Sequence, residues 1–128
     1  MFVVIARLTL HIESSQSLKD KRGVVRKIKD RVRDRFHIVL SEVGDQAVLD
    51  SWQRCDLAFS VITRERAGAE DAVASIHGFI ESLGVAERRH ARHEVQVFGD
   101  DWYGTPAERE GGDDAAWIPP EWREEAGR

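Results

Sequence analysis

The histidines and the single cysteine are the side chains of this sequence most readily used in catalysis or metal binding. His90 and His93, in the segment RRHARHEV, have a spacing that can hold zinc, but no second ligand pair and no cysteine pair accompany them. Cys55 opens a predicted strand, where a buried thiol is usually inert. The sequence has no glycine-rich phosphate loop, and its carboxylates show no pairing typical of acid–base catalysis. We therefore predict no catalytic residue, no metal, no cofactor and no small-molecule substrate, and expect a protein that acts by binding.

The strongest chemical signal is a concentration of positive charge. Residues 18–35 carry nine basic and three acidic side chains, although the whole chain has a net charge of −4. Such a face can bind a phosphate backbone by counterion release without reading sequence. The alternative is a solvated helix surface that binds nothing. The predicted RNA contacts are Lys19, Lys21, Arg22, Arg26, Lys27, Arg33 and Arg54.

Lys21 is unusual because it falls between Val25 and Ile28 on the helical wheel, inside the apolar stripe. Three interpretations are open. Its stem can lie along the core while the ammonium reaches water. It can pair with Glu42, which shares a strand face with apolar residues, so that neither charge is buried alone. It can also bind a phosphate at the helix N-terminus.

The elements that must position these residues follow from hydrophobic periodicity. Alternating patterns predict strands, a 3.6-residue period predicts helices, and Ser17 is a plausible N-cap. The expected elements are a strand over 2–12, a helix over 18–36, a strand over 37–45, a loop with a turn of helix over 46–54, a strand over 55–63, a helix over 66–83 and a strand over 92–99. The order β-α-β-β-α-β predicts an α+β, ferredoxin-like sandwich over residues 1–99, in which two helices cover one face of a four-stranded antiparallel sheet.

The other face of that sheet is expected to be open. Its predicted residues include a single aromatic side chain, unlike the RNA-recognition sheets that stack bases on adjacent aromatics. This face therefore suits contact with protein: a second copy, another factor or the chain's own tail. The predicted interface residues are Val3, Ile5, Val39, Val43, Ile62 and Phe98. Trp52, beside Arg54, is either a lid over the core or an exposed stacking residue.

Residues 100–128 form a C-terminal extension of different composition. They contain all three prolines, carry a net charge of −6, and include Trp102, Trp117 and Trp122. They are either an unstructured extension or a segment that docks on this protein or on a partner. If the acidic tail folds back on the basic helix, it would compete with phosphate for that surface. The three tryptophans complete the predicted partner interface.

The totals indicate the compartment. One cysteine excludes a disulfide within the chain, no apolar run is long enough to span a membrane, and the N-terminal stretch lacks the features of a secretory signal. We expect a cytoplasmic protein without a membrane partner.

Two segments carry a family resemblance. SQSLKDKRGVVRKIKDRVRDRFHIVLSEV and SWQRCDLAFSVI are similar, in the same order, to the small bacterial YlxP-like proteins, a family of unknown function (number 503), over about residues 1–99. The resemblance implies a ferredoxin-like fold and no established enzyme activity. Genes of this family commonly lie near those for translation initiation factor two and ribosome-binding factor A, which implies a role near the ribosome or RNA. Typical members end soon after the fourth strand, so the resemblance does not extend to the tail.

The leading hypothesis is a non-catalytic accessory protein that binds structured RNA or ribosomal particles through its basic first helix. The alternative is a protein–protein module or homodimer that uses the open sheet face, with the tail as an anchor. Salt dependence separates the two, because phosphate contacts weaken steeply as salt rises and apolar contacts do not.

Overall fold

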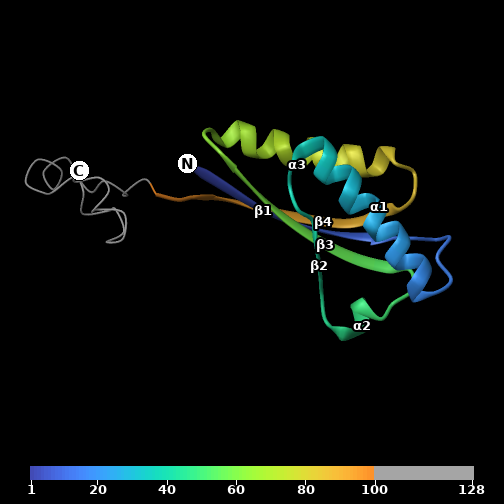
Figure 1. The fold of residues 1–128 in the computed structure, drawn as a ribbon. Helices are drawn as coiled ribbons and strands as arrows, with labels where there is room; N and C mark the ends of the chain where they lie inside the picture. Colours follow the sequence, from blue (N-terminus) through green and yellow to red (C-terminus); the bar gives the residue numbers. More distant parts are fainter. Residues whose placement is uncertain (100–128) are drawn as a thin grey trace, which may run out of the picture. The chain divides into compact units, whose positions relative to one another are not determined.

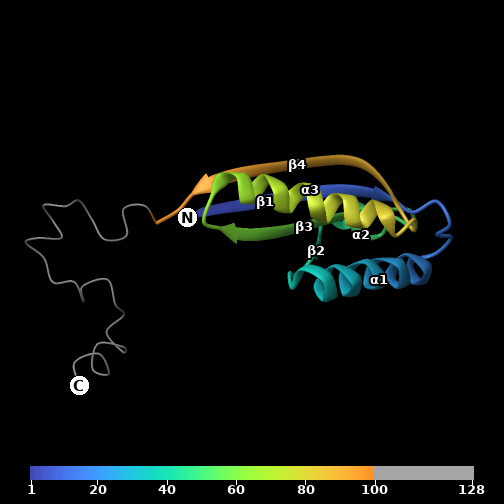
Figure 2. The ribbon, with the colours of Figure 1, turned by 90° about the horizontal axis from the view of Figure 1, so that it is seen from above.

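The computed structural model describes residues 1–99. Within them a four-stranded antiparallel sheet has the order β2-β3-β1-β4, and the two long helices lie on one of its faces (Figure 1; Figure 2). This arrangement confirms the predicted α+β, ferredoxin-like fold. The elements are β1 (Phe2–His11), α1 (Leu18–Phe36), β2 (Ser41–Val43), α2 (Gln46–Leu49), β3 (Arg54–Thr63), α3 (Arg66–Ser82) and β4 (Glu87–Val97). Internal contacts divide the chain into residues 1–96 and 97–128, and of the second unit only residues 97–99 are described.

The core lies between the sheet and the two long helices. Alternate residues of β1, from Val4 to Leu10, are almost completely buried, as the period-2 pattern predicts, and so is Ile12, which follows the strand. β1 pairs with β3 over ten residues, with Leu8 opposite Leu57. The helices fill the other side of the core with Val25, Ile28, Val32, Val73, Ile76 and Ile80.

α1 has defined ends that its sequence encodes. The Ser17 hydroxyl accepts a hydrogen bond from the Asp20 backbone N–H at 3.0 Å, and the Asp20 carboxylate accepts one from the Gln16 N–H at 3.0 Å. This reciprocal arrangement satisfies free N–H groups at the helix start. At the other end His37 adopts a left-handed conformation and donates to the Arg33 carbonyl. The predicted cap and helix limits are confirmed.

The second and fourth strands differ from the prediction. β2 contains only Ser41–Val43, because left-handed backbone at His37 precedes it and a positive φ of 114° at Gly44 ends it. Val39 is 74% exposed and lies before the strand, so its predicted place on the open sheet face is wrong. β4 begins at Glu87, five residues before the expected start at 92. It is an edge strand rich in charge, and this hides the alternation that sequence reasoning needs.

The turn of helix predicted within 46–54 is α2, which is capped by Asp45 through a hydrogen bond from the Val48 N–H. No helix within residues 1–99 is both long and apolar enough to cross a membrane.

Candidate nucleic-acid interface

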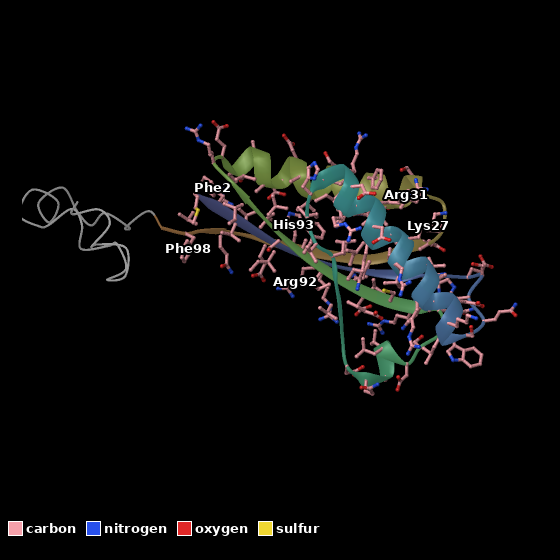
Figure 3. All side chains as sticks on the ribbon, viewed as in Figure 1. Phe2, Lys27, Arg31, Arg92, His93 and Phe98 are labelled. Atoms are coloured by element: carbon pink, nitrogen blue, oxygen red, sulfur yellow. The ribbon has the colours of Figure 1, made fainter. Side chains whose placement is uncertain are left out.

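The outer face of α1, which we define by Lys19, Arg22, Arg26, Lys27 and Arg33, is exposed as predicted. Arg33 is paired with Asp30 at 3.2 Å and lies 4.0 Å from Asp34. The other four cations have no hydrogen bond or ion pair with any part of the described chain. Figure 3 shows Lys27 and the neighbouring Arg31 projecting from α1 away from the sheet. Positive charge on this face is therefore available to an anionic partner.

A shallow groove of about 220 Å³ runs beside α1, on its β2 side. Arg22, Arg26 and Lys29 supply its cations, and Asp30 and Glu42 supply its carboxylates. The first and last of these cations are seven helical steps apart, or roughly 10 Å at a rise of 1.5 Å per residue. A row of cations of this length suits successive phosphates of a strand better than a single small anion.

Lys21 is buried and serves the structure. Its side chain is 2% exposed, and Nζ donates to the carbonyl oxygens of Val48 at 3.1 Å, Leu49 at 2.8 Å and Arg54 at 3.2 Å. Glu42 Oε1 lies 3.5 Å from the same nitrogen, so the predicted Lys21–Glu42 ion pair is present. An ammonium has three N–H donors, and the carbonyls use all of them. The predicted RNA contact of Lys21 is therefore wrong.

Two residues of the Trp-Gln-Arg segment hold neighbouring elements together, and the third, Trp52, is exposed. The Gln53 side-chain amide donates to the carbonyls of Glu13 and Ser15 at 3.1 Å, which ties the β1–α1 loop to the start of β3. The Arg54 carbonyl receives the Lys21 ammonium. Trp52 is 57% exposed, so its interpretation as a lid over the core is wrong, and its role as a stacking residue stays a prediction.

The Arg54 side chain belongs to a cluster on the helix-free face of the sheet. It makes two hydrogen bonds to the Asp56 carboxylate, both at 3.1 Å, and Arg7 Nη2 donates to the same carboxylate at 2.8 Å. Burial by itself would raise the pKa of Asp56, but the hydrogen bonds from Arg54, Arg7 and Thr9 outweigh it and lower that pKa to about 2. Arg54 is thus on the opposite face of the sheet from α1, and the structure does not bring it into the predicted RNA surface.

The predicted partner interface is only partly contiguous. Val3 pairs with Ile62 across β1 and β3, and Ile5 and Ile62 are 48% and 65% exposed. Val43 is half-buried opposite Asp56, and Phe98 is exposed just beyond the end of β4. Trp102, Trp117 and Trp122, and the proposed competition of the tail with phosphate, lie outside the described residues.

The polar middle of the open face was missed by sequence reasoning. Arg7, Asp56 and Arg92 lie there, and Figure 3 shows Arg92 on the side of the sheet away from the helices. A signal did exist: Arg54 and Asp56 alternate with core residues of the same strand, so both must face away from the helices.

The cysteine and the two histidines that could bind a metal or act in catalysis do not form a common site in residues 1–99. Cys55 is fully buried, and burial raises the pKa of its thiol to about 12, which keeps it protonated. His93 points toward α3 (Figure 3) and has its Nε2 2.7 Å from Glu70 Oε2. His90 is one of the residues that line the open sheet face. Residues 1–99 contain no group of three or more side chains placed to share a metal ion.

Two comparisons with known proteins place the chain in a family. A family model described as "Protein of unknown function (DUF503)" matches residues 3–93. Among curated proteins, "Uncharacterized protein YlxP" of Bacillus subtilis (strain 168) is 34% identical over 83 residues, which cover 65% of this chain and 87% of that protein.

Proposed function

Because the chain belongs to the DUF503 family, whose description gives no function, we propose one from its surface: a non-catalytic cytoplasmic protein that binds structured RNA, alone or within a ribosomal particle. One observation carries this proposal. Four cations of the outer face of α1, Lys19, Arg22, Arg26 and Lys27, are exposed and have no carboxylate partner within residues 1–99. Unpaired cations on a rigid helix favour an anionic polymer, because each phosphate contact releases counterions.

The contacts would be with the RNA backbone. Side chains cannot read the deep major groove of an RNA helix, so double-stranded RNA is recognised mainly through its shape, its phosphates and its 2′-hydroxyls. α1 presents lysine and arginine but no exposed aromatic side chain on its outer face. Lys29 lines the groove beside β2 and replaces the buried Lys21 in the set of proposed phosphate contacts.

Charge reversal on α1 tests this function. In the double variant Arg26→Glu/Lys27→Glu we expect the affinity for an RNA hairpin to fall about tenfold or more at moderate salt, because two phosphate contacts are lost. The plot of log affinity against log salt concentration should become less steep, with the magnitude of its slope smaller by about one to two. Fluorescence anisotropy of a labelled hairpin between 50 and 200 mM KCl measures both, and co-sedimentation with ribosomal subunits extends the test to particles.

The matched control is Arg64→Glu/Arg89→Glu, which changes the net charge equally but outside α1; both arginines are exposed. We expect it to bind nearly as well as the unmodified protein. An equal loss in the control, or no binding by the unmodified protein at low salt, would rule out RNA recognition by α1.

The alternative function, association with protein through the open sheet face, rests on the exposure of Ile5 and Ile62. These two side chains, with Val3, form a small apolar area, and isolated patches of that kind are common on monomers. We therefore expect light scattering to give the mass of one 14.5 kDa chain. A doubled mass that returns to one chain in Ile62→Glu would instead favour a homodimer through this face.

A further inference from the structure

A pocket of about 450 Å³ opens on the helix-free face of the sheet, where β1, β3 and β4 lie side by side. Its volume falls in the range of about 300–1,000 Å³ that is typical of small-ligand sites. The residues that carry the argument are Ile5, Arg7, Arg54, Asp56, His90 and Arg92. The outer face of α1 is on the other side of the sheet, so this pocket is separate from the proposed RNA surface.

Asp56 organises the pocket. Its side chain is only 1% exposed although no helix covers this face, because Arg7 from the neighbouring strand β1 and Arg54 from its own strand, β3, lie against it. Each carboxylate oxygen is used: Oδ1 accepts from Arg54 and Oδ2 accepts from both arginines. A buried carboxylate is costly unless it is paired, and here its pairing fixes two guanidinium groups in place. Both arginines remain about half exposed, so further N–H donors face the pocket.

The charge that remains is positive. Two arginines share one carboxylate at Asp56, and Arg92 is paired with Glu94 at 3.2 Å at the other side of the pocket. The three arginines therefore exceed the two carboxylates by one charge. Fixed guanidinium forks match the geometry of phosphate oxygens and bind them through two hydrogen bonds at once.

Ile5 supplies an apolar wall in the same pocket, beside the guanidinium groups of β1 and β3. A ligand that satisfies both features has a phosphate group joined to a planar, weakly polar body. We propose that this pocket binds a nucleotide unit, with its phosphate on Arg7 and Arg54 and its base against Ile5. This chemistry can come from a free mononucleotide or from one nucleotide of a single-stranded RNA.

NMR titration of the full chain tests this site with three probes: adenosine 5′-monophosphate, inorganic phosphate and a single-stranded oligouridylate. We expect saturable shifts of the Arg7 and Arg54 side-chain Nε–H signals and of neighbouring strand amides, with tighter binding of a nucleotide than of phosphate alone. Saturation by the mononucleotide but not by the oligomer identifies a free nucleotide as the ligand. Preference for the oligomer identifies RNA.

Side-chain variants make the assignment specific. Arg7→Gln and Arg54→Gln should each weaken nucleotide binding about tenfold, the effect of one hydrogen bond between charged groups. Arg89→Gln is the matched control, since Arg89 is exposed to the same degree as Arg7, pairs with Glu87 and lies outside the pocket. Unchanged binding in the first two variants, or shifts confined to α1, would overturn the site. Phosphate that binds as tightly as the nucleotide would overturn the role given to Ile5.

Asp56→Asn separates positioning from charge. If Asp56 only offset positive charge, its neutralisation would tighten anion binding. If Asp56 positions the arginines, the same substitution weakens binding about threefold or more despite the added net charge, and we expect this result. Thermal unfolding of the variant shows whether it is folded, and the arginine variants remain decisive if it is not. Arg26→Glu/Lys27→Glu should keep nucleotide binding, so failure of RNA binding by α1 and failure of this pocket are distinguishable.

Discussion

Replacing Lys21 by methionine is expected to lower the free energy of unfolding by about 3 kcal/mol, the scale for removing one partner of a buried charge network. Methionine keeps most of the apolar stem but removes the ammonium. The Leu49 and Arg54 carbonyls then lose a charged donor, and Glu42 loses its cation. Urea unfolding at neutral pH measures the change, which should appear as a lower midpoint with an unchanged m-value.

Two further variants isolate the cause. Lys19→Met alters an exposed residue of the same helical turn and should change stability by no more than about 0.5 kcal/mol. Glu42→Gln should cost less than Lys21→Met, because Glu42 is partly exposed and its oxygen is 3.5 Å from the ammonium, whereas the carbonyls lie closer. A loss below about 1 kcal/mol in Lys21→Met would mean that the three carbonyl contacts contribute little.

Protonation of Asp56 at low pH is expected to lower the free energy of unfolding by roughly 2 kcal/mol. The pKa of this carboxyl falls from 3.8 to about 2 in the folded protein, so the unfolded chain takes up the proton first. The stabilisation is complete above pH 4 and is lost as the pH falls toward 2. Its source is the hydrogen bonds from Arg54, Arg7 and Thr9, which exceed the cost of burial.

Comparison of the unmodified protein with Asp56→Asn, by chemical unfolding at several pH values between 7 and 2, measures this contribution. Asparagine cannot ionise, so the stability gap between the two proteins should narrow as the pH falls from 4 to 2. The control is Asp30→Asn, which changes a carboxylate of intermediate exposure that pairs with Arg33. This substitution should hardly change how the free energy of unfolding depends on pH between 4 and 2. If the free energy of unfolding depends on pH in the same way in the unmodified protein and in Asp56→Asn, the loss of stability in acid does not come from Asp56.

Local patterns account for much of the fold. β1 alternates strictly, α1 combines a Ser17 cap with a 3.6-residue apolar stripe, and Gly84 follows the last turn of α3, so each element was predictable within a few residues. The Lys21–Glu42 pair was also accessible, because each residue sits among apolar neighbours on one predicted face. The carbonyl partners of Lys21 were not, since they depend on where α2 ends and β3 begins in space.

Contacts between distant residues explain the errors. The Arg7–Asp56 pair joins positions 49 residues apart, and only the observed register of β1 and β3 brings them together. Arg54 was therefore assigned to the basic helix and not to Asp56. Trp52 and Val39 lie in connections between elements, where side-chain direction follows loop geometry and not a period.

The Lys21 ammonium also has a consequence for local opening. α2 is one turn long, and a helix of that length has almost no stability of its own in water. The Lys21 side chain, from the start of α1, donates hydrogen bonds to the last two carbonyls of α2 and to the carbonyl of Arg54, the first residue of β3. We therefore expect the start of α1 and the segment around α2 to open together, because local unfolding of either one breaks the contacts of the Lys21 ammonium.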